Sequence, residues 1–226
     1  MPQSDFLRVV ERSSGLMRKA QSELDQTKRL AEEGNMVGAF ESAFTFADLV
    51  ERLALLARSL PAYTGHPRAA EQTEALLEET IPVSMGFTRE GWFCLRIPAL
   101  IPKKGSGSPS YLRDFLYPAM RRFFSGKLPA SYPDCVLIFR HIYDRRRPER
   151  AWRDHDNIEV NLVADIVALY LLPDDAPRRC AHYYCSAAGD QDRTEVYVVP
   201  CDGLTAWLHA LKAGDLEEVE VLENLP

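Results

Sequence analysis

The hydrophobic period of this chain changes at Trp92, so the fold must join a helical part to a part that contains strands. Before that point, apolar residues recur at three-, four- and seven-residue spacings over residues 5–33. Residues 36–59 are apolar around most of a helical circumference, and Gly34 stands between the two patterns as a helix stop. We therefore predict an N-terminal helical hairpin, followed by a short helix over residues 67–80.

After Trp92 the apolar runs are short and rich in the residue types that strands favour. The predicted strands cover residues 92–97, 135–143, 181–187 and 194–199, and the predicted helices cover residues 111–124, 157–171 and 204–213. Gly189-Asp190 indicates a hairpin between the last two strands. This order predicts an α+β fold, with a small mixed β-sheet and flanking helices behind the N-terminal hairpin.

We expect three segments: a helical region over 1–85, an α+β domain over 86–201, and a C-terminal helix with an acidic tail over 202–226. No apolar run reaches the roughly 18 residues needed to cross a bilayer, and the first residues lack a secretory pattern. The five cysteines include no C-x-x-C pair. These features predict a cytoplasmic protein without a membrane partner, whose thiols are reduced and mostly buried.

Charge is unevenly distributed along the chain, whose net charge is −6. Residues 1–90 carry −4, residues 91–153 carry +9, and residues 154–226 carry −11. Two interpretations stay open at this point. Either the basic and acidic blocks neutralise each other across the fold, or the basic block contacts phosphates while nearby carboxylates hold a metal ion.

Asp154 and Asp156 are separated by one residue, so they point the same way if the segment is extended. Asp156 also precedes the predicted helix at 157–171. A carboxylate at that position caps the helix and is stabilised by the backbone N–H groups of the first turn. Asp174 and Asp175 follow that helix on a loop that we expect to return to the same edge of the sheet. Clustered carboxylates indicate a Mg²⁺ or Mn²⁺ site, although a helix cap and a turn would explain each pair separately.

Three other signals concern single residues. His155 lies between the two aspartates, and in a strand it would point away from them, which favours a structural role over that of a general base. Cys180 and His182 share one face of a predicted strand and Cys185 takes the other, so a zinc site is not expected. Lys103 and Lys104 open a glycine- and serine-rich loop, which we predict to be a mobile basic flap beside DNA.

This arrangement resembles the RusA family of Holliday junction resolvases over residues 91–200. That family has a basic stretch, then Asp-x-Asp-Asn, an amphipathic helix and a closing Asp-Asp. The matching runs here are Arg145-Arg146-Arg147, Arg153-Asp154-His155-Asp156-Asn157, Val163 to Leu169, and Asp174-Asp175. The chain also looks similar to an uncharacterised bacterial family often carried on mobile elements.

The resemblance implies a small mixed-sheet dimer that cleaves four-way DNA junctions with Mg²⁺ or Mn²⁺. It implies that Asp154, Asp156 and Asp175 are the catalytic metal ligands and that Asn157 and Asp174 support them. One position departs from the family, because Val160 stands where the family carries a catalytically important lysine. The cations that we expect to contact DNA, some of which are candidates to replace that lysine, are Lys103, Lys104, Arg145, Arg146, Arg147 and Arg153.

Our leading hypothesis is a metal-dependent, structure-selective DNA endonuclease that acts on branched DNA as a homodimer, with N-terminal helices that bind a protein partner. The first alternative is a catalytically inactive nucleic-acid-binding or scaffold protein on a RusA-like fold. The second is a structural α+β protein whose basic and acidic blocks pair internally. Steep salt dependence of DNA binding would separate the first two hypotheses from the third.

Overall fold

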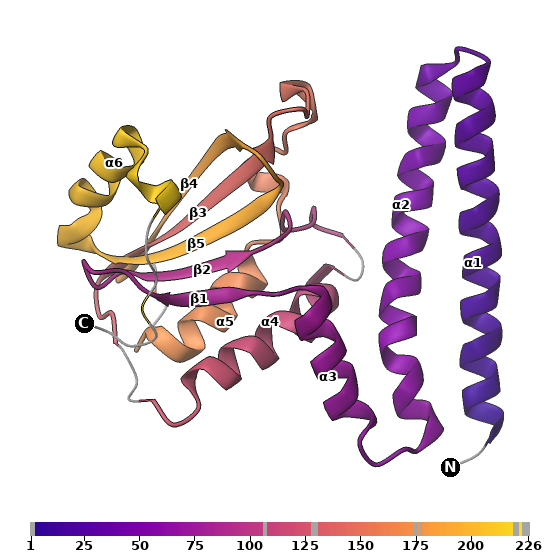
Figure 1. Ribbon diagram of the computed structural model, residues 1–226, viewed down its shortest axis with the longest axis horizontal. Helices are drawn as coiled ribbons and strands as arrows, with labels where there is room; N and C mark the ends of the chain where they lie inside the picture. Colours follow the sequence, from indigo (N-terminus) through magenta and orange to yellow (C-terminus); the bar gives the residue numbers. More distant parts are fainter. Residues whose placement is uncertain are drawn as a thin grey trace. The chain divides into compact units, whose positions relative to one another are not determined.

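Figure 1 shows the computed structural model, which describes residues 3–105, 108–127, 131–173, 176, 178–218 and 222. It divides into two compact units, Met1–Leu76 and Leu77–Pro226. No helix within the described ranges is both long enough and apolar enough to cross a membrane. The predicted α+β class is confirmed, with an N-terminal helical hairpin and a five-stranded mixed sheet.

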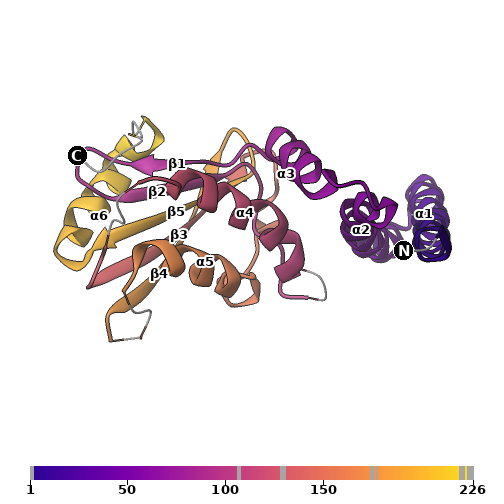
Figure 2. The ribbon, with the colours of Figure 1, turned by 90° about the horizontal axis from the view of Figure 1, so that it is seen from below.

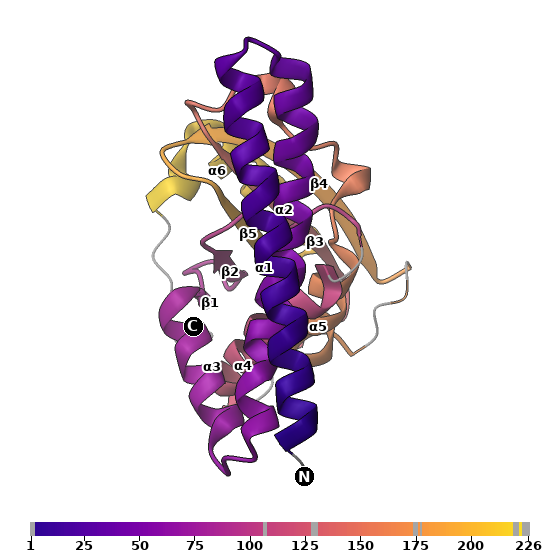
Figure 3. The ribbon, with the colours of Figure 1, turned by 90° about the vertical axis from the view of Figure 1, so that its right-hand side faces the viewer.

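Two long helices make up most of the N-terminal unit. These helices, α1 (Gln3–Glu32) and α2 (Met36–Ser59), run side by side as a hairpin (Figure 3). Asn35 caps α2, because its side chain accepts a hydrogen bond from a backbone N–H of the first turn. Ser42 of α2 is buried and donates to the backbone carbonyl and the carboxylate of Glu23 on α1. The helical period therefore located both helices correctly.

The C-terminal unit is built on a sheet with the strand order β1-β2-β5-β3-β4, which can be followed in Figure 2. Only the β3 and β4 strands pair in parallel, and the other neighbours are antiparallel. A 3₁₀ turn, η1 (Leu60–Thr64), and a third helix, α3 (Ala69–Thr80), lead into this sheet. The strands are β1 (Ser84–Phe87), β2 (Phe93–Ile97), β3 (Cys135–Asp144), β4 (Cys180–Gly189) and β5 (Arg193–Pro200).

Helices cover both faces of the sheet, with α4 (Ser108–Phe124) and α5 (Asn161–Leu171) on one face and α6 (Leu204–Ala213) on the other (Figure 1). Side chains alternate along each strand, so β3 contributes to both layers. Leu137 of β3 belongs to the larger core under α4 and α5. Ile138 belongs to a smaller core around Trp207 of α6.

The last two strands do not form the predicted hairpin. Strand β3 lies between them, pairing in parallel with β4 on one side and antiparallel with β5 on the other. The crossover through α5 makes β4 parallel to β3, and the short connection after Gly189 then passes over the end of β3 to reach β5. Tyr183 of β4 and Tyr197 of β5 are consequently both register partners of Ile138, one on each side of β3.

Candidate functional site

The polar residues at the centre of the sequence motif lie on a short turn, Asp154–Asn157, which we call the carboxylate turn. Asp154 has an extended backbone, but residues 155–157 form a 3₁₀ turn closed by a hydrogen bond of 3.1 Å from the Asn157 N–H to the Asp154 carbonyl. The predicted extended segment is therefore wrong, and strand alternation cannot align the two carboxylates. The side chains of Asp154, Asp156 and Asn157 are all exposed.

Helix α5 begins at Asn161, four residues later than predicted, so Asp156 does not cap it. Val160 occupies the N-cap position, and no side chain caps the helix there. Ile158 has an extended backbone, and Ile158 and Val160 are both buried in the larger core, with 1% and 4% of their surface exposed. Burying both side chains requires the chain to stay out of the helix until Asn161, which explains the shift.

A basic segment is held against the carboxylate turn by backbone hydrogen bonds. The Lys104 N–H donates to the Asn157 carbonyl at 2.9 Å, the Glu159 N–H donates to the Pro102 carbonyl at 2.9 Å, and Lys103 and Ile158 form an isolated antiparallel bridge. The Lys104 ammonium donates to the backbone carbonyl of Asp156 at 2.7 Å. Lys103 and Lys104 are thus anchored beside the carboxylates by their own backbone, which a mobile flap would not be.

Arg153, just before the turn, is fixed from both its backbone and its side chain. Its N–H donates to the Tyr143 hydroxyl at 3.0 Å, and its guanidinium donates to the Ile101 carbonyl. The Tyr143 ring stacks on Trp152 with centroids 4.7 Å apart. Arg153 therefore joins the end of β3 to the loop that carries the lysines.

The three consecutive arginines of the predicted DNA-binding loop each lie in an ion pair. Arg145 pairs with Asp190 at 2.9 Å, Arg146 pairs with Asp144 at 2.7 Å, and Arg147 pairs with Asp192. The hydrogen bond from the Arg146 guanidinium lowers the pKa of the Asp144 carboxyl to about 2. The pairs of Arg145 and Arg147 join the basic block to the acidic block, as in the first of the two charge interpretations, whereas Arg146 pairs within the basic block.

The carboxylate turn supplies two of the three expected metal carboxylates. Asp174 and Asp175 lie outside the described residues, so the third ligand is not part of this geometry. In the part of the chain that the structure describes, no group of three or more His, Cys, Asp and Glu side chains is arranged to hold a metal ion. Two exposed carboxylates still suit Mg²⁺, which proteins commonly hold with one or two carboxylates together with water and substrate phosphates.

His155, in the middle of the carboxylate turn, lies beside a second histidine, His141 of β3. The Nε2 atom of His155 is 2.9 Å from the Ser186 hydroxyl, and its ring lies 5.8 Å from that of His141 and 5.9 Å from that of Tyr184. His141 is buried and its Nδ1 lies 3.4 Å from the Thr194 hydroxyl. The sequence pointed only to His155, because His141 meets Ser186 and Thr194 through the pairing of distant strands, which a local pattern does not show.

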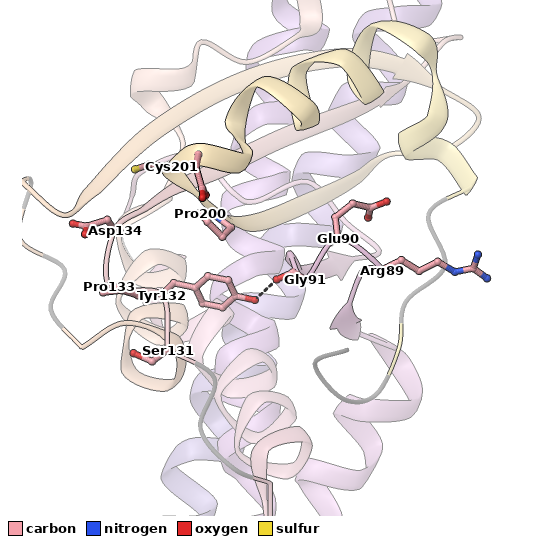
Figure 4. A pocket seen from close by; sticks show the side chains of 10 residues that line it. Arg89, Glu90, Gly91, Ser131, Tyr132, Pro133, Asp134, Pro200 and Cys201 are labelled. Atoms are coloured by element: carbon pink, nitrogen blue, oxygen red, sulfur yellow. Dashed lines mark hydrogen bonds between the residues drawn. The ribbon is translucent and has the colours of Figure 1, made fainter.

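A separate pocket of about 740 Å³ lies at the opposite end of the sheet, where β3 begins and β5 ends (Figure 4). The Tyr132 hydroxyl points across it and donates to the Gly91 carbonyl at 2.7 Å. Its lining includes the acidic side chains of Glu90, Asp134 and Asp202 together with Arg89. This pocket is separate from the carboxylate turn, because the ten residues of β3 lie between them.

The chain matches a family of unknown function (DUF6100) over residues 2–224. No curated protein and no solved structure matches it.

Proposed function

We propose that this chain, which belongs to the DUF6100 family of unknown function, is a metal-dependent endonuclease that acts on branched DNA. One observation carries the proposal. The Lys104 ammonium, bound to the Asp156 carbonyl at 2.7 Å, supplies a positive charge at the carboxylate turn. The resolvases that the sequence resembles carry a catalytically important lysine at the position that Val160 occupies here, so Lys104 would supply the charge from another segment of the chain.

In this proposal Asp154 and Asp156 hold a Mg²⁺ or Mn²⁺ ion, with Asp175 as a further ligand and Asn157 and Asp174 in support. Such an ion, when bound, lowers the pKa of a water molecule and stabilises the leaving oxygen of a phosphodiester. Lys104 and Lys103 would neutralise the phosphate next to the scissile bond. The hydrogen bond from His155 to Ser186, or the reverse, holds the middle of the turn against β4, so that the two flanking carboxylates stay exposed.

DNA binding would draw on Arg145, Arg146, Arg147 and Arg153 as well as on the lysines. In the ion pairs of Arg145 and Arg146, every side chain except that of Asp144 is largely exposed. Exposed ion pairs contribute little to stability, so a phosphate can replace the carboxylate at modest cost. The pairs therefore weaken DNA binding without preventing it.

The experiment measures cleavage of a labelled four-way DNA junction by the full chain with Mg²⁺ or Mn²⁺, with a linear duplex as comparison. Asp156→Asn and Asp154→Asn are expected to abolish cleavage, and Lys104→Met to slow it at least tenfold. Lys212→Met removes the same charge from an exposed position on α6 and is expected to leave the rate unchanged. Junction binding without cleavage would replace the proposal with an inactive binding protein on the same fold.

A binding measurement separates the metal from the DNA. Mn²⁺ titration by calorimetry is expected to show weaker binding in Asp154→Asn and Asp156→Asn than in the unmodified chain. Unchanged affinity in both variants would remove the metal site from the proposal, whatever the DNA result.

We further propose that the chain acts as a homodimer in the cytoplasm and that the N-terminal hairpin provides a protein-binding surface. Apolar side chains on α2 are exposed, including Phe40 at 70% and Phe44 at 61%. All five cysteines are free, which suits a reducing compartment. Light scattering tests the dimer: an unmodified chain that is monomeric would contradict it, and loss of the dimer in Phe40→Ser and Phe44→Ser would place the dimer interface on this surface of α2.

A further inference from the structure

Three cysteines lie near one end of the sheet. Cys135 begins β3 and Cys180 begins β4, and the two are direct register partners in the parallel pair. Cys201 follows β5, whose Pro200 is the register partner of Cys135 on its other side. Cys135 and Cys180 are buried, whereas Cys201 is exposed and lines the pocket described above.

The thiols of Cys135 and Cys180 are close enough to bond. Cys135 and Cys180 are register partners on adjacent strands, so their side chains point to the same face. Neighbouring strands lie about 4.8 Å apart. Disulfides bridge Cα atoms separated by roughly 4.4–6.8 Å. A bond between these two sulfurs therefore needs only local adjustment of the strand ends.

His182 distinguishes Cys180 from its partner. It lies two residues further along the same face of the edge strand, and its Nδ1 atom is 3.1 Å from the Tyr184 hydroxyl. The neighbouring Cys135 thiol, and then His182, lower the pKa of the Cys180 thiol well below its usual range. The Cys180 thiol in turn raises the pKa of His182.

The thiols of Cys94, which is buried, and Cys185, which is half-buried, have the opposite character. Burial raises the pKa of Cys94 to about 12 and that of Cys185 to about 11. The neighbouring Cys180 thiol, followed by burial, raises the pKa of Cys135 far above its usual range. Thiolate is the reactive form of cysteine, so Cys180 is the nucleophile of the set and Cys135 is the neighbour that can resolve it.

We propose that Cys180, His182 and Cys135 form a peroxide-reactive thiol site that closes to a Cys135–Cys180 disulfide. In the first step the Cys180 thiolate attacks one oxygen of hydrogen peroxide, the S–O bond forms and the O–O bond breaks. The departing hydroxide takes a proton from the His182 imidazolium, which yields water and a sulfenic acid on Cys180. The Cys135 sulfur then attacks the Cys180 sulfur, and the hydroxyl leaves as a second water with the Cys135 proton.

The disulfide would also have a structural consequence, because it would tie β4 to β3 across the crossover segment that contains α5 and the carboxylate turn. The disulfide would thus restrict the conformations of the unfolded chain over a segment that contains the proposed nuclease residues. The thiol site itself does not depend on the proposed nuclease function.

The test treats the full chain with a small excess of hydrogen peroxide, quenches with acid, blocks free thiols with iodoacetamide during denaturation, and maps linked peptides by mass spectrometry. We expect a Cys135–Cys180 link and the loss of two thiols. Cys135→Ser is expected to stop at a Cys180 sulfenic acid, which a cyclic 1,3-diketone traps. His182→Gln, at an exposed position that does not threaten the fold, is expected to slow the reaction of Cys180 at least tenfold.

Cys201→Ser is the matched control, because Cys201 is the most accessible of the five thiols and its loss should leave the Cys135–Cys180 link unchanged. Oxidation of Cys201 ahead of Cys180 would overturn the proposal. So would a reaction of Cys180 no faster than that of Cys94 and Cys185, or an unchanged rate in His182→Gln.

Discussion

At the scale of single residues, Val160 explains the departure from the resolvase motif. Its side chain is 4% exposed and packs in the larger core, so a lysine there would place an ammonium group among apolar side chains. We expect Val160→Lys to lower the free energy of unfolding by about 3 kcal/mol, as an unpaired buried charge does. Urea unfolding tests this, with Val160→Ile as the control that keeps the site apolar. A Val160→Lys variant as stable as the unmodified chain would contradict the prediction.

On the face of the sheet that α6 covers, the buried charged side chains share Glu195 as a partner. Its carboxylate accepts hydrogen bonds of 2.9 Å from both Arg140 and Arg193 and one of 3.0 Å from the Tyr197 hydroxyl, and only 1% of its side chain is exposed. Removing the charge leaves the Arg140 guanidinium buried without its carboxylate partner. Glu195→Gln is therefore expected to cost about 3–5 kcal/mol of stability.

Chemical denaturation of Glu195→Gln measures that cost, and Asp190→Asn serves as the comparison. Asp190 also pairs with an arginine, but its side chain is 85% exposed, so its loss should change stability little. Equal effects of the two substitutions would show that burial does not set the strength of these pairs.

His141 should make the fold sensitive to acid. Burial, and then the nearby positive charges of His155 and Arg153, lower the pKa of His141 to about 4, compared with 6.5 for a free histidine. Between these two values the unfolded chain binds a proton that the folded chain excludes, so stability falls as the pH falls from about 6.5 to 4. The loss should reach about 3 kcal/mol at pH 4.

Urea unfolding between pH 7.5 and 4 measures this loss in the unmodified chain and in His141→Asn. The variant lacks the titrating group and should lose less stability in acid, while its carboxylates titrate as before. Parallel pH profiles would mean that His141 is not the cause.

At the scale of elements, the sequence predicted where most helices and strands lie but not how they pair. Period and residue type are local properties, and they located α2, α6 and β3 within a residue. Sheet order depends on contacts between distant segments, so the short Gly189-Asp190 connection was read as a hairpin although β3 inserts between its strands. The start of α5 was missed for a related reason, because the burial of Ile158 in the core is not visible from local pattern.

The candidate site shows the same division between local and distant information. The sequence identified Asp154 and Asp156 from their spacing, and the resemblance added roles for them. The contacts that define the site come from elsewhere in the chain: Lys104 reaches Asp156 from 52 residues away, and Ser186 reaches His155 from 31 residues away. No spacing rule connects such residues, which is why the lysine was only one of several candidates beforehand.

The arginine loop and the β4–β5 connection act as one element through their ion pairs. Asp190 and Asp192 neutralise Arg145 and Arg147, so they compete with any phosphate for the same guanidinium groups. We expect Asp190→Asn combined with Asp192→Asn to tighten binding of a four-way junction about tenfold, because released arginines contact phosphate without first breaking a pair. Fluorescence anisotropy at fixed salt measures this, and weaker or unchanged binding would place DNA away from this loop.

At the scale of the whole molecule, the net charge of −6 opposes DNA binding, so we expect binding to draw on a local excess of cations, as in residues 91–153 with their charge of +9. If four of the six cations Lys103, Lys104, Arg145, Arg146, Arg147 and Arg153 each contact one phosphate, the logarithm of the binding constant should fall with that of the salt concentration with a slope of about −3.6. Affinity should then drop roughly a hundredfold between 50 and 200 mM salt.

A shallower salt dependence is expected if the three arginines keep their present ion pairs when DNA binds. If the three arginine pairs persist in the complex, the expected phosphate contacts among these six cations fall to those of Lys103, Lys104 and Arg153, and the slope should be no steeper than about −2.7. Substituting Lys104 by Met should make the slope shallower by about one phosphate in either case. A salt titration of junction binding by the unmodified chain and by Lys104→Met thus counts the phosphate contacts. The absence of binding at every salt concentration would mean that the basic and acidic blocks only neutralise each other within the fold.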